Sequence, residues 1–92
     1  MKIGIPVYDK VDLLDVAAPY EIFSWAREYG AGIEVELMAA AVSQVSTRDG
    51  FCFKVGTRFD DVAGVDVLWV PGGAPAALHA LMHEAPPSIW IS

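Results

Sequence analysis

The sequence has few of the features that mark secreted or membrane-spanning proteins. It contains one cysteine, Cys52, which excludes an internal disulfide framework and fits a reducing compartment. Its first residues lack the apolar core of about 7–15 residues that a signal peptide needs. No run approaches the roughly 18 apolar residues of a membrane span. We therefore expect a cytoplasmic protein that does not bind membranes.

Positive charge is also scarce. Lysine and arginine together number 6, against 12 aspartate and glutamate residues, and the formal net charge is −6. Nucleic acids and anionic membranes attract basic surfaces, so this segment is not expected to bind either.

Apolar residues, in contrast, are abundant for a chain of this size. They make up 54% of the 92 residues, which suffice for one domain at most. A domain this small buries only about 60–65% of the surface of its unfolded chain. Apolar surface should therefore remain for a partner, and an unpaired sheet edge would favour contact with it. We expect a homo-oligomer, or pairing with a complementing fragment.

The pattern of apolar residues and turn signals predicts alternating strands and helices. The expected elements are a strand at Lys2–Tyr8, a helix at Val16–Tyr29, a strand at Ile33–Val42, a hairpin of 44–47 and 51–55 with an Asp49-Gly50 turn, a helical turn within 57–64, a strand and elbow at Val65–Pro75, a helix at Ala76–Ala85 and a further element at Pro87–Ile91. This order is typical of the first half of an open, mostly parallel α/β sheet with a small β-hairpin.

Some side chains have specific expected places within these elements. Pro19 should lie in the first turn of its helix, because deeper in a helix proline costs about 3 kcal/mol. Pro75 suits the first position of the second helix, and Leu78, Leu81 and Met82 should form its buried side. Asp15 precedes the first helix and is expected to be its N-cap, a role that does not exclude a chemical one.

The stretch Val65–Pro75 is the most informative one. It contains an uncharged segment that leads into Pro71-Gly72-Gly73, and this sequence is typical of a strand that turns sharply into a helix. The N–H groups of such an elbow suit an anion or a developing oxyanion, although a tight turn without chemistry gives the same pattern. The loop Asp9–Asp15 also follows a strand, so both should lie at one sheet edge and bind a small molecule there.

Three separated motifs resemble those of the ThiJ/PfpI superfamily, whose proteins have a class I glutamine-amidotransferase-like fold. Leu14-Asp15-Val16-Ala17-Ala18-Pro19-Tyr20-Glu21-Ile22-Phe23 resembles the family's Leu-Asp-x-x-Gly-Pro-x-Glu-Val-Phe segment, with Ala18 in place of the usual glycine. The stretch from Val65 to Gly73 is similar to its Asp-hydrophobic-Pro-Gly-Gly elbow, and Val45–Asp61 to its hairpin and Phe-Asp-Asp turn. The resemblance implies a flavodoxin-like three-layer sandwich.

The nearest branch contains isonitrile hydratases, which are lyases that act on a small electrophile, and the amidase-like domains of AraC-type regulators, which sense a ligand. The resemblance to the hydratases implies that Asp15 moves a proton and that the N–H groups of Gly72 and Gly73 stabilise an oxyanion. It implies no cofactor. It places the nucleophilic cysteine beyond Ser92, so residues 1–92 would be the N-terminal part of one domain and inactive alone.

Other candidate residues have weaker support. Cys52 is expected to be structural, since no helix N-terminus or histidine adjoins it. His79 and His83 have metal-chelating spacing but lack a third ligand, so a solvated helix face is favoured. Asp9, Asp12 and Asp15 lack the glycine and terminal glutamate of an EF-hand. Glu21 is either a solvated charge or a second polar group near the site or a subunit contact. No metal site is predicted.

Overall fold

A parallel sheet of three strands lies at the centre of the molecule. The computed structural model describes residues 1–40, 43–62 and 64–84. Strands β1 (Lys2–Pro6), β2 (Glu34–Met38) and β5 (Val67–Leu68) form this sheet in the order β2-β1-β5, with all pairs parallel. Strands β3 (Ser43–Ser46) and β4 (Cys52–Val55) form a separate antiparallel hairpin. The predicted α/β class with a mostly parallel sheet and a small hairpin is confirmed.

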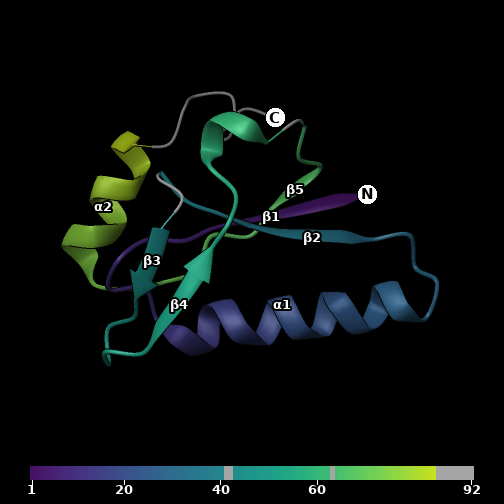
Figure 1. Cartoon of the computed structure of the whole chain (residues 1–92), viewed down its shortest axis with the longest axis horizontal. Coiled ribbons are helices and arrows are strands. Elements are labelled where there is room, and N and C mark those ends of the chain that lie inside the picture. The colour runs from purple at the N-terminus through teal and green to yellow at the C-terminus, as the bar shows by residue number, and fades with distance from the viewer. Residues whose placement is uncertain (41–42, 63, 85–92) are drawn as a thin grey trace.

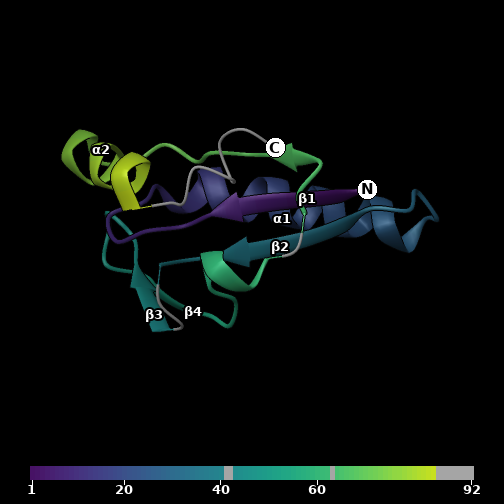
Figure 2. The same cartoon turned by 90° about the horizontal axis from the view of Figure 1, so that it is seen from above.

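Two α-helices complete these elements. Helix α1 (Leu13–Glu28) runs along the sheet, whereas α2 (Pro75–Glu84) and the β3–β4 hairpin lie beyond the carboxyl end of β1 (Figures 1 and 2). A short 3₁₀ helix, η1 (Phe59–Asp61), fulfils the expectation of a helical turn within 57–64. The predicted element at Pro87–Ile91, together with its Pro86-Pro87 boundary, lies outside the described residues.

Pro6 fits the central strand because it is the strand's last residue. The N–H of Val7 donates to the Met38 carbonyl of β2 at 2.8 Å. Successive backbone groups of a strand point to opposite sides, so the nitrogen of Pro6 faces the β5 side. Strand β5 pairs only with Ile3 and Gly4, so no ladder partner is lost there. The same short pairing makes β5 shorter than the predicted strand.

The core is formed by side chains from both faces of β1 and from the loops that follow the strands. Ile5 and Val11 are fully buried, and Leu81 of α2 is 1% exposed. The expectation for Met82 is wrong, since this residue is 61% exposed. A residue one position beyond Leu81 is turned by about 100° on the helix, and α2 packs on the core along a narrow line only.

Helix α1 differs from its predicted form in two ways. It begins at Leu13, three residues earlier than expected, so Pro19 lies inside the helix and not in its first turn. Proline there cannot donate to the carbonyl of Asp15, four residues earlier, and that carbonyl therefore loses its helical partner. The second difference is its end, which lies at Glu28, one residue before the predicted Tyr29. A line of apolar residues on this helix faces solvent: Leu14, Ile22, Trp25 and Tyr29.

Candidate active site at the β1–β5 switch point

The loops that follow β1 and β5 are joined by backbone hydrogen bonds. The N–H of Asp12 donates to the Gly72 carbonyl at 2.8 Å, and the N–H of Ala74 donates to the Lys10 carbonyl at 3.1 Å. The chain passes from β1 to β2 on one side and later reaches β5 on the other, so this is the topological switch point of the sheet. The expected meeting of the Asp9–Asp15 loop and the Pro71–Gly73 elbow is present.

Asp15 contacts the elbow directly. Its Oδ2 accepts a hydrogen bond from the N–H of Gly72 at 3.1 Å, across 57 residues of sequence. Asp15 is not the N-cap of α1, because Asp12 occupies that position and makes no side-chain cap hydrogen bond. The expected capping role of Asp15 is therefore wrong. Its carboxylate is exposed in the first turn of the helix and is held by the elbow.

The two elbow glycines are needed for close packing. A Cβ atom on Gly72 would lie 2.9 Å from Oδ2 of Asp15. A Cβ atom on Gly73 would lie 2.7 Å from both the Lys10 carbonyl oxygen and the Tyr8 hydroxyl oxygen. Neither glycine has the positive φ that marks the left-handed region. At Gly73 the Lys10 backbone carbonyl leaves no space for a side chain, whereas the exposed Asp15 carboxylate could turn away from one at Gly72.

The two amides differ in their availability to a ligand. The N–H of Gly72 is bonded to Asp15, so it can serve an oxyanion only after that carboxylate turns away. The N–H of Gly73 has no hydrogen-bond acceptor within residues 1–40, 43–62 and 64–84. In this conformation the N–H of Gly72 is engaged and that of Gly73 has no acceptor among the described residues, whereas the resemblance implies that both act as oxyanion donors.

Tyr8 is a component of the site that sequence reasoning missed. It follows β1, is 8% exposed, and donates its hydroxyl hydrogen to the Pro71 carbonyl at 2.7 Å. Burial raises the pKa of Tyr8 to about 12, with further contributions from the negative charges of Asp12 and Asp15. The position of Tyr8 could have indicated its role, because a polar aromatic residue at the carboxyl end of a buried strand lies where such sheets bind ligands.

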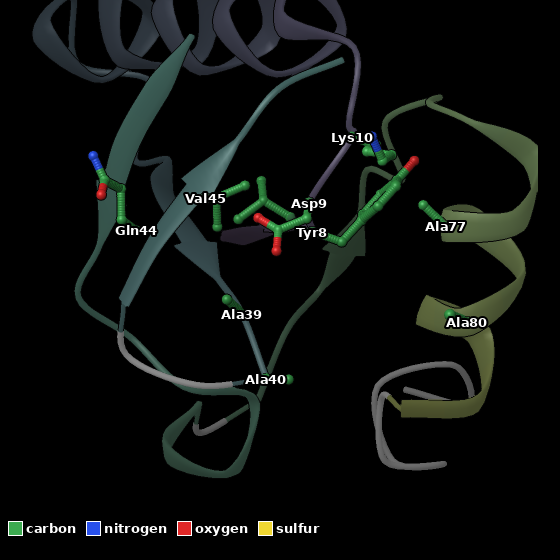
Figure 3. A pocket seen from close by; sticks show the side chains of 10 residues that line it. Tyr8, Asp9, Lys10, Ala39, Ala40, Gln44, Val45, Ala77 and Ala80 are labelled. Atoms are coloured by element: carbon green, nitrogen blue, oxygen red, sulfur yellow. The ribbon is translucent and has the colours of Figure 1, made fainter. Parts of the chain in front are cut away.

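Tyr8 also lines a cavity of about 400 Å³. Figure 3 shows Tyr8 and Asp9 between the β3–β4 hairpin and α2, with Ala77 and Ala80 facing them from the helix. The other residues that line the cavity are Val7, Lys10, Ala39, Ala40, Gln44 and Val45. Lys10 has a φ of 72°, which is uncommon for a residue with a side chain and fits a tightly shaped loop. The cavity has the size of a small-molecule site.

Comparisons with known proteins identify the relatives of this arrangement. No family model matches the chain. The isonitrile hydratase of Pseudomonas putida is 30% identical over 74 residues, which are 80% of this chain and 31% of that protein. The uncharacterized protein in the cpoL 5' region of Streptomyces lividans is 32% identical over 72 residues, which are 78% of this chain and 51% of that protein.

Solved structures share the fold. A ThiJ/PfpI family protein from Pseudomonas syringae superposes with a TM-score of 0.63 at 21% identity, over 80% of this chain and 29% of that chain. The chain is therefore similar in sequence to an isonitrile hydratase and in fold to proteins of the ThiJ/PfpI superfamily. An AraC family transcriptional regulator from Pseudomonas putida superposes with a TM-score of 0.67 at 12% identity, over 80% of this chain and 41% of that chain. The chain thus spans about half or less of the length of each of these proteins.

The remaining candidate residues of the chain lie away from the switch point. Cys52 is a free, exposed thiol on β4, 3.2 Å from the Ser46 hydroxyl, and it does not line the cavity beside Tyr8. Glu21 is exposed on α1, and His79 and His83 are exposed on α2. Within the described ranges, no three histidine, cysteine, aspartate or glutamate side chains gather as metal ligands. None of the helices described is both long and apolar enough to cross a membrane.

Proposed function

We propose that this chain forms the proton-transfer and oxyanion-binding side of an isonitrile-hydratase-like active site. The observation that supports the proposal is the contact of Asp15 Oδ2 with the Gly72 N–H at the switch point of the sheet. This contact fixes an exposed carboxylate beside an amide donor, and such a pair is suited to handle a proton and a developing negative charge.

The reaction that fits this arrangement is the addition of water to the carbon of a small isonitrile. A thiolate would add to that carbon, and Asp15 would deliver the proton that the same carbon takes up. Water would then add to the thioimidate carbon, and one of its protons would return to Asp15 while the other passes to the nitrogen. Departure of the sulfur as a thiolate would leave the formamide and restore the protonated Asp15. Cys52 does not fit as the nucleophile because it lies on the hairpin, away from the Asp15–Gly72 contact.

The two glycines would act at different moments in this reaction. Gly73 offers a free N–H from the start, whereas Gly72 becomes a donor when the Asp15 carboxylate moves toward the substrate. Proton transfer and oxyanion stabilisation would then be linked through one side chain. Tyr8 would act as a positioning residue, because its hydroxyl holds the Pro71 carbonyl at the start of the elbow.

Replacing Asp15 in a hybrid enzyme tests this proposal. The matching segment of the Pseudomonas putida isonitrile hydratase is exchanged for this chain, and formamide production is measured. Asp15→Asn should lower kcat by about 10²–10⁴-fold, the usual contribution of a general acid or base, while its amide oxygen can still accept from Gly72. Asp60→Asn, on the exposed η1 helix, is the matched control and should leave kcat unchanged.

Two results would contradict the enzyme proposal. A folded hybrid in which Asp15→Asn keeps the full rate would remove the catalytic role of Asp15. A folded hybrid that binds an isonitrile but does not hydrate it would favour the second candidate, a ligand-sensing domain like those of AraC-type regulators. That candidate is supported by the superposition on the AraC family transcriptional regulator, which covers 80% of this chain with a TM-score of 0.67.

We also propose that the chain associates with a second copy or a complementing partner through α1. Its exposed apolar line includes Leu14, which is 74% exposed, and Trp25, which is 55% exposed. The spacings of the four side chains are 8, 3 and 4 residues, each close to a whole number of helical turns, so they lie on one helix face. Burial of such a face in an interface would remove it from water.

A charge placed in this line should therefore prevent association. Trp25→Lys is expected to shift the protein toward a monomer in sedimentation velocity, because a buried ammonium group would be unpaired in the interface. Met82→Lys is the control, since it also replaces an exposed apolar side chain on a helix but lies on α2. A wild-type protein that sediments as a folded monomer would refute the proposal.

A further inference from the structure

Helix α2 carries two exposed imidazole rings that do not line the cavity. His79 and His83 are both exposed, and their ring centroids lie 4.6 Å apart with an interplanar angle of 64°. Ala77 and Ala80 line the cavity from the same helix (Figure 3). Since each helical residue turns by about 100°, His79 lies about 200° from Ala77 and about 100° from Ala80, whereas His83 lies about 60° from Ala80. Neither histidine lines the cavity.

The spacing of the rings is suited to chelation. Residues four apart in a helix have their side chains one above the other, so both imidazoles can present a nitrogen to one ion. Imidazole is a good ligand for Zn²⁺, Cu²⁺ and Ni²⁺. Neither ring forms a hydrogen bond or an ion pair with another residue that the structure describes. Little local structure would therefore need to break on binding.

We propose that His79 and His83 form a bidentate site for a divalent transition metal ion on the outer face of α2. Water would complete the coordination, because both rings are exposed. Affinity should follow the order of these ions for nitrogen ligands, with Cu²⁺ binding more tightly than Ni²⁺ or Zn²⁺. The site is separate from Asp15 and from the cysteine chemistry of the proposed function.

Metal binding at this site would also stabilise the helix that follows the elbow. Helix α2 begins at Pro75, two residues after Gly73, and the ion would join two successive turns of it. A ligand that binds the folded helix and not the unfolded chain shifts the equilibrium toward the folded state. The ion should thus raise the Tm of the protein and hold the Ala77–Ala80 wall of the cavity in place.

The test uses the untagged chain with Cys52→Ser, which removes the only thiol that could bind the metal. Calorimetric titration with Cu²⁺ should show one ion per chain. His79→Gln and His83→Gln should each weaken binding by at least about tenfold, because the second ligand no longer acts intramolecularly. Addition of Cu²⁺ should raise the Tm of the parent protein and not that of the single variants.

The matched control keeps two imidazoles but separates them. In His79→Gln/Ala76→His, the rings lie seven residues apart, about 10.5 Å along the helix axis, which is too far for one ion. This variant should bind as weakly as the single variants and keep its helix content in circular dichroism. Binding by the control as tight as that of the parent, or no binding by the parent, would overturn the proposal.

Discussion

Gly73→Ala is expected to lower the free energy of unfolding by about 1–3 kcal/mol, the range for adding a methyl group to a packed site. The new Cβ would lie 2.7 Å from the Lys10 carbonyl oxygen and 3.0 Å from Cε2 of Tyr8. The first of these is a backbone atom, so it cannot move without distorting the loop. For a domain of this size, each kcal/mol corresponds to about 4–8 °C in Tm, which thermal unfolding can measure.

Gly56→Ala provides the control for this prediction. No atom lies within 4 Å of a Cβ built on Gly56, and its φ is outside the left-handed region. The change should be neutral or stabilise the protein by about 0.4–1 kcal/mol, because alanine reduces the freedom of the unfolded chain. Equal Tm values for the two variants would mean that the elbow does not pack against Tyr8 and Lys10 as described.

Tyr8→Phe is expected to have the second large effect, which depends on pH. Without the hydroxyl, the buried carbonyl of Pro71 loses its donor, and this should destabilise the protein by about 1–3 kcal/mol at neutral pH. Tyr29→Phe is the control, because Tyr29 is 89% exposed and its replacement should have little effect. Urea unfolding of the three proteins measures both differences.

The pH dependence follows from the direction of the shift in pKa. The pKa of Tyr8 rises from 10.0 to about 12 on folding, so the folded state binds the phenolic proton more tightly than the unfolded state. The stability that folding gains from the protonated Tyr8 hydroxyl is fully present below pH 10 and is lost as the pH rises to about 12. The loss should be about 2–3 kcal/mol, at about 1.4 kcal/mol for each pKa unit.

In Tyr8→Phe, the loss of free energy of unfolding that is caused by ionisation of Tyr8 should be absent, while the loss caused by other groups remains. The difference between wild type and variant should therefore narrow between pH 10 and 12. A difference that stays constant over this range would show that Tyr8 does not keep its proton through burial at the elbow.

The fold class could be predicted from sequence because it depends on local patterns. The order of strand and helix signals, the Asp49-Gly50 turn and the glycines after Tyr29 are properties of neighbouring residues. Gly30 and Gly50 indeed have φ values of 86° and 91°. Pro75 begins α2 as expected, because proline at a first helical position satisfies a local rule.

The errors occurred where distant residues compete with local preference. The sequence rules place Asp15 at an N-cap and Pro19 in the first turn, yet α1 starts at Leu13 and contains both. Contacts outside the helix accompany this start. Val16 and Pro19 are buried, and the Gly72 N–H donates a hydrogen bond to the Asp15 carboxylate. Tertiary contacts can offset a proline inside a helix, whereas a local rule contains no term for them.

The sequence by itself determined the strand and helix order, the acidic charge, the single thiol and the Pro71-Gly72-Gly73 elbow, since each depends on residue type and spacing alone. The tertiary structure decided that Asp15 occupies the Gly72 amide and that Tyr8 holds the elbow from inside. These contacts join residues 57 and 63 positions apart. Only the parallel pairing of β1 with β5 brings them together, and no local pattern fixes the geometry of that pairing.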